Sequence, residues 1–255
     1  MVRVLALLLV LTGIGLAAPA EAGSKVRVTT ANIYVGLGPD AARADLRRAM
    51  RHGNVVLTQE MKNRRIDVSG WRRFTPGRRH CREVQTYWRR SVWRHVRHAA
   101  VVLVRGDAFP HQTRCANVVV LRHRATGRLV RFVNIHLHPH VELGGHPRAC
   151  CPRKTRAYAR AMDRLDRIVA RPGRIVVGGD WNVGRRADCR VRWHGFPCAH
   201  LSGPLNTPPL RSSSPTRGNR HIDVNWYSPQ FGLRQVRTIG HTRSDHQFSR
   251  VVLGW

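Results

Sequence analysis

The stretch with the clearest chemical potential is residues 174–183, RIVVGGDWNV, which runs from branched apolar residues through two glycines into an acid and an amide. Ile and Val in a short run are typical of a buried strand, and glycines at its end allow a bend or a close approach of the backbone. Asp180 and Asn182 are two residues apart, so on extended chain their side chains point to the same side. A carboxylate and an amide presented together suit a phosphate accompanied by a hard metal ion. A strand followed by an ordinary polar turn is the competing interpretation.

Further polar residues occupy similar positions in a chain that has few acids. Lying in or at the ends of strand-like runs, or next to such a residue, are Asn32, Glu60, His136, Asp223, Asp245 and His246. Carboxylates can bind a hard cation, histidine can act as acid or base near neutral pH, and asparagine can hydrogen-bond a phosphoryl oxygen. Together these residue types predict metal-assisted phosphodiester hydrolysis.

A second pattern, HLHPH at residues 136–140, allows a different chemistry. On extended chain His136, His138 and His140 share one face, which is compatible with a transition-metal site. The pattern is similar to the first metal motif of metallo-β-lactamases, but the Asp-His continuation is replaced by Val141-Glu142. The sequence therefore favours His138 and His140 as surface histidines.

The elements that must position these residues alternate between strands and two helices. Strands are predicted at residues 25–32, 54–60, 99–104, 116–121, 129–136, 174–180, 221–228 and 248–253, and helices at 41–51 and 155–170. In the second helix Tyr158, Met162, Leu165 and Val169 form one apolar stripe. Because no linker divides residues 23–255, we expect one α/β domain with two sheets and helices outside.

Residues 63–98 are dense in arginine, with Trp71, Phe74, Tyr87, Trp88 and Trp93 interleaved. Arginine with aromatic residues can bind a nucleic-acid backbone and stack on bases. Equally, the aromatics could be core residues of short strands beneath a solvated basic surface.

The N-terminus has the pattern of an export signal. Residues 1–22 contain Arg3, an apolar run over residues 4–18 and a small-x-small cleavage site at residues 20–22, which predicts a secretory signal peptide and a secreted protein. A retained N-terminal anchor is the alternative. No later run is long enough for stable insertion into a membrane.

Six cysteines follow the predicted signal, an even number that suggests up to three disulfides in an exported chain. From the order of the segments we expect Cys81 to pair with Cys115, and Cys150 and Cys151 to pair with Cys189 and Cys198. Zinc binding is disfavoured because C-x-x-C pairs do not recur.

The composition is strongly basic, with 45 lysines and arginines against 14 acids and a net charge of +31. Only Lys25, Lys62 and Lys154 are lysines, and arginine grips phosphate in a bidentate manner. A surface this positive attracts polyanions with salt-sensitive affinity. Nucleic acid, anionic lipid and acidic cell-wall polymers are all compatible partners.

Six motifs in order carry a resemblance to a known family. They are TTAN (29–32), LTQE (57–60), VNIHLH (133–138), GGDWN (178–182), HIDVNW (221–226) and RSDH (243–246). In this order they resemble the endonuclease/exonuclease/phosphatase superfamily, which has the deoxyribonuclease I-like fold. The resemblance implies a four-layer α/β sandwich of two mainly antiparallel sheets flanked by helices, and a divalent metal, usually Mg²⁺, with Mn²⁺ or Ca²⁺ as alternatives.

The resemblance also implies roles for individual residues. Glu60 would bind the metal directly, with Asn32 and Asp245 assisting. His136 would contact the scissile phosphate as an acid, oriented by Asp223. The phosphate and the attacking water would be held by Asp180 and Asn182, and His246 would be a general base or a phosphate ligand. Glu83 is the candidate for a carboxylate that orients His246, and Tyr87 is a candidate catalytic tyrosine.

Three functions remain open at this point. The first is a secreted, metal-dependent nuclease acting on DNA, with RNA as a further candidate substrate, that binds nucleic acid through its arginine-rich surface as a monomer. The second is a lipid or inositol-phosphate phosphodiesterase or phosphatase of the same fold, which normally needs an exposed hydrophobic hairpin. The third is a non-catalytic polyanion-binding protein, which the completeness of all six motifs disfavours.

Overall fold

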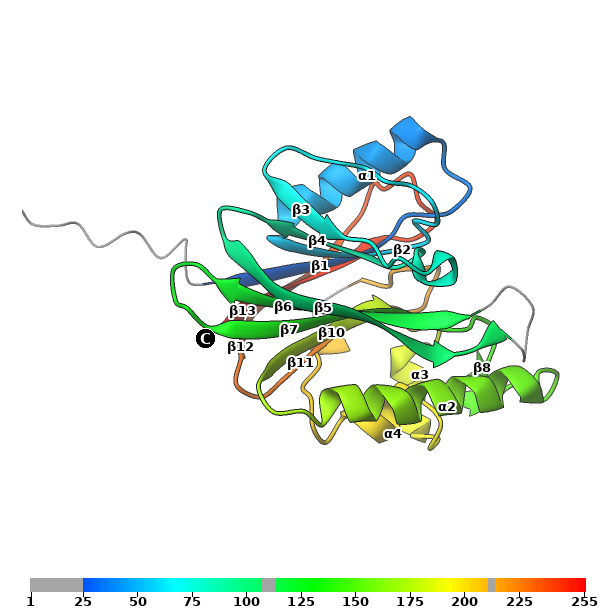
Figure 1. The fold of residues 1–255 in the computed structure, drawn as a ribbon. Helices are drawn as coiled ribbons and strands as arrows, with labels where there is room; N and C mark the ends of the chain where they lie inside the picture. The colour runs from blue at the N-terminus through cyan, green and yellow to red at the C-terminus, as the bar shows by residue number, and fades with distance from the viewer. Residues whose placement is uncertain (1–24, 107–112, 211–213) are drawn as a thin grey trace, which may run out of the picture.

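The computed structural model describes residues 25–106, 113–210 and 214–255, and its strands form two large sheets that pack face to face (Figure 1). The predicted signal peptide lies outside the described residues. The first sheet has the order β12-β13-β1-β2-β4-β3. Its strands are β1 (Val26–Asn32), β2 (Val55–Gln59), β3 (Trp71–Phe74), β4 (Gln85–Arg89), β12 (Gly232–Ile239) and β13 (Phe248–Gly254).

The second sheet has the order β11-β10-β7-β6-β5. Its strands are β5 (Trp93–Val104), β6 (Arg114–His123), β7 (Leu129–His136), β10 (Arg174–Asp180) and β11 (Asp223–Tyr227). A short hairpin of β8 (Glu142–Leu143) and β9 (His146–Pro147) stands apart. Only β1–β2 and β7–β10 pair in parallel, so both sheets are mainly antiparallel, as predicted.

Helices cover the two outer faces and complete four layers (Figure 1). Helix α1 (Pro39–His52) lies on the first sheet, while α2 (Pro152–Val169), α3 (Arg185–Val191) and α4 (Pro197–Leu201) lie on the second. The predicted apolar stripe of α2 is buried against the second sheet. Between the sheets, alternate strand residues such as Val28, Leu57 and Phe132 form the central core, which packs the two sheets against each other.

The arginine-rich region contains strands that periodicity did not locate. Tyr87, Trp88 and Trp93 are buried in β4 and β5, while Trp71 and Phe74 of β3 are half-buried, so these aromatics pack as strand residues. Strand β12 was also not predicted, because Ile239 is its single buried residue and it forms an edge of its sheet. Helices α3 and α4 are too short for a helical period to show.

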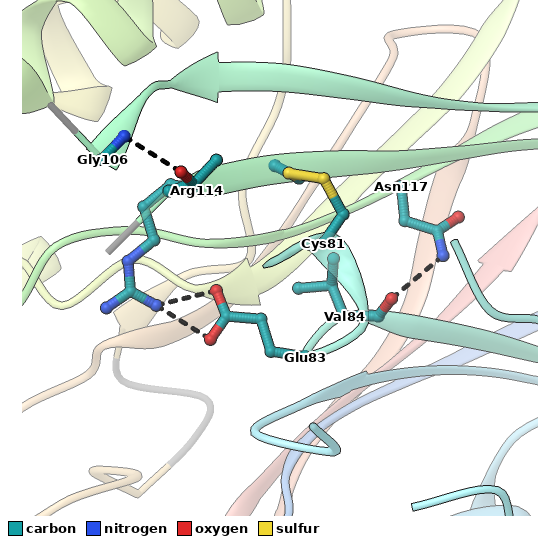
Figure 2. The surroundings of a disulfide bond; sticks show 8 residues. Cys81, Glu83, Val84, Gly106, Arg114 and Asn117 are labelled. Carbon is teal, nitrogen blue, oxygen red and sulfur yellow. Dashed lines mark hydrogen bonds and ion pairs between the residues drawn. A yellow bond between two sulfur atoms is a disulfide. The ribbon is translucent and has the colours of Figure 1, made fainter. Parts of the chain in front are cut away.

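Two disulfides are present, and one of them matches the expected pairing. Cys81 bonds to Cys115 across 34 residues, next to the Glu83–Arg114 ion pair (Figure 2). The second expected pairing was wrong, because Cys189 bonds to Cys198 only nine residues away. The turn from α3 to α4 brings these two Cα atoms to 5.0 Å. Cys150 and Cys151, at the start of α2, are free and have Sγ atoms 2.7 Å apart.

Among the described helices, none combines the length and apolar character needed to cross a bilayer.

Candidate active site

The predicted site residues meet where strands from both sheets end. Strands β1 and β2 run parallel, as do β7 and β10, so their carboxyl ends lie at common edges. In the second sheet Asp180 pairs in register with His136 on one side and with Asp223 on the other. Asn32 of the first sheet donates to Asp180 Oδ2 at 3.0 Å, which joins the two sheets at the site.

The two glycines before Asp180 permit this close approach. A Cβ at Gly178 would collide with Asn225 of the neighbouring strand β11 and with Thr30 of the facing strand β1, and a Cβ at Gly179 would collide with the backbone of Ile135. Gly179 also has φ +154°, a conformation that suits glycine. The sequence GGD therefore packs the end of β10 tightly between its neighbours and fixes the position of the acid.

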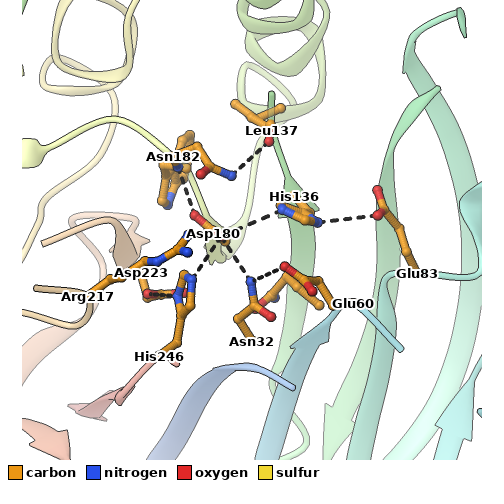
Figure 3. A network of polar contacts seen from close by, with 12 residues as sticks. Asn32, Glu60, Glu83, His136, Leu137, Asp180, Asn182, Arg217, Asp223 and His246 are labelled. Carbon is orange, nitrogen blue, oxygen red and sulfur yellow. Dashed lines mark hydrogen bonds and ion pairs between the residues drawn. The ribbon is translucent and has the colours of Figure 1, made fainter. Parts of the chain in front are cut away.

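Asp180 is the centre of the polar network (Figure 3). It is 1% exposed, and its Oδ2 lies 3.6 Å from His136 Nε2 and 3.9 Å from His246 Nε2. Its Oδ1 accepts a 2.8 Å hydrogen bond from the backbone N–H of Asn182. One imidazole at the end of β7 and one from the loop before β13 thus point their Nε2 atoms at one buried carboxylate, and His136 and Asp180 also line a cavity.

Two of the three residues expected to bind metal, Asn32 and Glu60, lie next to Asp180. Asn32 Nδ2 donates to Glu60 Oε1 at 3.0 Å, and the Val35 N–H donates to Glu60 Oε2 at 2.8 Å. Asn32 Oδ1 is buried and has no hydrogen-bond partner among the described residues, which is costly for a polar atom. The Asn32 amide, with its nitrogen between the carboxylates of Glu60 and Asp180 and its oxygen unsatisfied, thus belongs to a group of oxygen ligands that fits a hard divalent cation.

The structure changes the predicted pairing of the histidines. Asp223 does not orient His136; its Oδ2 lies 2.8 Å from Nδ1 of His246. Both side chains are almost completely buried. Burial alone would lower the pKa of His246, but Asp223 first, and then Asp180 and Asp245, outweigh it and raise that pKa to about 9. We therefore expect a charged imidazole that faces Asp180.

His136 is oriented by Glu83 instead, which corrects the expectation that Glu83 serves His246. Glu83 Oε2 lies 3.3 Å from His136 Nδ1, and Arg114 Nη1 lies 2.8 Å from Glu83 Oε1 and 3.1 Å from the same His136 nitrogen. Burial would raise the pKa of Glu83, but Arg114 and then His136 reverse this and lower it to about 2. Glu83 is therefore an anion that holds both partners.

Arg114 was not foreseen from the sequence, because nothing distinguishes it locally from the other arginines. Its neighbour Cys115 forms the disulfide with Cys81, two residues before Glu83 (Figure 2). The disulfide thus ties the loop that carries Glu83 to the strand that carries Arg114. A signal did exist in the sequence, since the predicted Cys81–Cys115 pair brings Glu83 and Arg114 together.

The remaining predicted residues lie at the rim of the site or outside it. Asp245 forms a 2.8 Å ion pair with Arg217 and, among the described residues, no hydrogen bond or ion pair with Glu60 or Asn32. Asn182, with φ +56°, donates to the Leu137 carbonyl at 3.0 Å. Tyr87 is buried and its hydroxyl bonds to Gln85 at 3.1 Å; burial raises its pKa to about 12. This position does not support a catalytic tyrosine.

The HLHPH segment does not form a histidine cluster in the part of the chain that the structure describes. Only His136 joins the network around Asp180, and no group of three potential ligands includes His138 or His140. His138 is buried, which lowers its pKa to about 3, so it is not the surface histidine that we expected. His140 is exposed and lines the site.

The network opens into a cavity of about 300 Å³. Its walls carry the acids Glu60, Glu83 and Asp180 and the cations Lys62, Arg114 and Arg217. Such a mixture can hold a cation and a phosphate side by side, because each charge has a complementary group in the wall.

Comparisons with known proteins place this geometry in context. The family model described as "Endonuclease/Exonuclease/phosphatase family" matches residues 29–246. A search of curated proteins found no match.

Similar solved structures have low sequence identity but cover nearly the whole chain. The mannosyl-6-phosphatase Bt3783 of Bacteroides thetaiotaomicron is 16% identical with a TM-score of 0.67, covering 90% of this chain and 100% of that one. The human Nocturnin catalytic domain, solved with bound sulfate, is 15% identical with a TM-score of 0.63, at 90% and 94% coverage. TDP2 of D. rerio, complexed with single-strand DNA product, is 13% identical with a TM-score of 0.67, at 91% and 100% coverage. These similarities confirm the predicted four-layer fold.

Proposed function

Because this chain belongs to the endonuclease/exonuclease/phosphatase family, we propose that it is a secreted, divalent-metal-dependent nuclease that hydrolyses DNA. Members of the family are metal-dependent phosphoester hydrolases. The observation that carries the proposal is the convergence of His136, His246 and Asn32 on the buried carboxylate of Asp180.

Each group in this network has a task that its surroundings suit. His246, held by Asp223 and charged at neutral pH, binds a non-bridging phosphate oxygen and stabilises the negative charge that develops there. Asp180 accepts the proton of the attacking water, and Asn182 helps to position that water and the phosphate. His136, fixed by Glu83, lies on the opposite side of Asp180, where it can protonate or hydrogen-bond the leaving oxygen.

Glu60 and Asn32 would hold the metal, with Asp245 nearer the rim. A bound divalent cation would supply Lewis-acid stabilisation of the phosphoryl group. Mg²⁺ suits an all-oxygen donor set in which water completes the coordination, and Mn²⁺ and Ca²⁺ are the alternatives to test.

A polyanionic substrate is favoured by charge. The chain carries a net charge of +31, which attracts nucleic acid over long distances. The exposed large hydrophobic side chains among the described residues are Tyr34, Val96, Leu129 and Leu143, which lie on separate elements and form no docking hairpin. This distribution argues against a lipid substrate.

Secretion and a monomeric state are parts of the same proposal. The sequence of residues 1–22 has the signal pattern, and two disulfides are typical of exported proteins.

A substrate panel tests the proposal. Plasmid DNA, RNA, sphingomyelin and an inositol phosphate are each incubated with the mature protein in Mg²⁺ and in EDTA. We expect Mg²⁺-dependent cleavage of plasmid and none in EDTA. Turnover of sphingomyelin or inositol phosphate without plasmid cleavage would reject DNA as the substrate, and binding of DNA without turnover of any phosphoester would reject catalysis.

A further inference from the structure

A second, larger cavity adjoins the site. It measures about 840 Å³, which is within the usual range of ligand-binding pockets. His140 lines both cavities, and the turn at residues 217–220 contributes Arg217 to the smaller cavity and Arg220 to the larger one. A substrate bound in the active site can therefore continue directly into the larger cavity.

The wall of this cavity is strongly basic. Its arginines are Arg148, Arg186, Arg190 and Arg220, and Glu142 is the single acid among its lining residues. The Glu142 carboxylate is already used, because it accepts from Arg220 and from the backbone N–H groups of Gly145 and Gly184. The cavity therefore presents an excess of positive charge.

Arg186 and Arg190 are two neighbouring cations of this wall. They are four residues apart on α3, so they lie on one face of that helix. Both are exposed, and the described residues offer them neither a hydrogen bond nor an ion pair. Two guanidinium groups side by side suit successive phosphates, each of which arginine can grip in a bidentate manner.

Contacts on two sides of α3 fix the position of this helix and of the two arginines that it carries. Asp188, on the buried face of α3, accepts from the Cys198 N–H at 3.0 Å, and Cys189 is bonded to Cys198. On the other side, the β8–β9 turn packs so closely that a Cβ at Gly145 would collide with the Ala187 carbonyl. Arg186 and Arg190 are therefore held toward the cavity by contacts on both sides of the helix.

We propose that this cavity binds the phosphates of a nucleic-acid strand that flank the scissile one, with Arg186 and Arg190 as the phosphate-binding residues. The proposal rests on the proposed nuclease function and deepens it. It predicts that the enzyme distinguishes a polynucleotide from a small phosphodiester by contacts outside the catalytic network.

The test compares the double variant R186A/R190A with the control R43A/R47A. Arg43 and Arg47 are also exposed, also four residues apart, and lie on α1, on the outer face of the first sheet. Both variants lose two positive charges. Binding of a fluorescein-labelled 16-base-pair duplex is measured by anisotropy in EDTA at several salt concentrations, and turnover of bis(p-nitrophenyl) phosphate is measured in Mg²⁺.

We expect R186A/R190A to weaken duplex binding about tenfold more than R43A/R47A does at low salt. The slope of log affinity against log salt should fall by about 1.8 relative to the control, since each lost phosphate contact contributes about 0.9. Turnover of bis(p-nitrophenyl) phosphate should stay within about twofold of wild type, because that substrate does not reach α3.

Equal salt-dependence slopes of duplex binding for the two double variants would overturn the proposal. A loss of bis(p-nitrophenyl) phosphate turnover in R186A/R190A as large as its loss of duplex binding would overturn it as well. Loss of binding to vesicles of anionic lipid with unchanged duplex binding would overturn it too, and would assign the cavity to a membrane surface. If wild-type protein binds the duplex through Arg186 and Arg190 but never cleaves DNA, the nuclease function fails while the binding surface stands.

Discussion

Replacing Asp223 with Asn should change the charge state of His246 and the pH dependence of stability together. The carboxylate of Asp223 lies 2.8 Å from His246 Nδ1, and both side chains are almost fully buried. Burial lowers the pKa of His246, but the Asp223 carboxylate outweighs it and raises that pKa from 6.5 to about 9. At 1.36 kcal/mol per unit this corresponds to about 3 kcal/mol of favourable interaction with the charged imidazole, for which Asp223 is the largest favourable cause.

The pH dependence of this stabilisation follows from the linkage between protonation and folding. Since the folded-state pKa is above the unfolded value, the stabilisation is fully present below pH 6.5 and is lost as the pH rises through 9. Asp223→Asn should therefore destabilise the protein by up to about 3 kcal/mol at pH 6 and by much less at pH 10.

Two measurements in EDTA check this prediction. Urea unfolding of wild type and Asp223→Asn at pH 6, 8 and 10 gives the stability difference, and an NMR titration gives the pKa of His246. We expect that pKa to fall toward 6.5 in the variant. A His246 pKa that stays near 9, or a destabilisation that is independent of pH, would refute the inference that Asp223 holds the charge on His246.

Other predictions concern the groups that support the site. From the lengths of the loops that the disulfides close, Cys81→Ser should lower the free energy of unfolding by about 4 kcal/mol and Cys198→Ser by about 2.5 kcal/mol. Only Cys81→Ser should also lower kcat, because its disulfide holds Glu83 beside Arg114. An equal kcat for the two variants would show that the disulfide does not position Glu83. Burial raises the pKa of Asp188 to about 7, so this residue should favour folding most at low pH and lose that contribution as the pH rises from about 4 to 7. In urea unfolding, Asp188→Asn should therefore be more stable than wild type at pH 8 and not at pH 4. Glu60→Gln should abolish the rise in melting temperature that Mg²⁺ produces in wild type, as measured by scanning fluorimetry; an unchanged rise would place the metal elsewhere.

The sequence was informative wherever a residue's role depends on its own strand. Asp180 and Asn182 follow a strand whose glycines are required by the neighbouring backbone, and the branched apolar run before them predicted that strand. The same holds for Asn32, Glu60 and His136, which end β1, follow β2 and end β7. Local pattern was sufficient because each residue lies at the carboxyl end of a regular element.

Pairing between distant segments was less accessible. The pairing of Asp223 with His246 joins β11 to the loop before β13, and the pairing of Glu83 with His136 joins the region before β4 to the end of β7. Either carboxylate could have served either histidine, since both choices satisfy the same residue types. The pairing of each carboxylate with its histidine depends on which sheet carries each residue, and local periodicity does not encode how the two sheets face each other.

Short or exposed elements were missed for a related reason. Strand β12 has a single buried residue, and helix α3 spans only seven residues. A hydrophobic period cannot show over such stretches. The consequence extends to function, because α3 carries Arg186 and Arg190, and no local pattern distinguishes these two from the other arginines.

The network around Asp180 is proposed to cleave DNA with a divalent metal. Plasmid nicking in Mg²⁺ by Asp180→Ala and His246→Ala tests it most directly, with His200→Ala as the control, since His200 also pairs with an acid, Asp166, but lies on α4. We predict that both site variants lose nicking by at least about a thousandfold, as expected when groups that stabilise transition-state charge are removed, while DNA binding and the activity of His200→Ala persist. Nicking that survives both Asp180→Ala and His246→Ala would contradict the account.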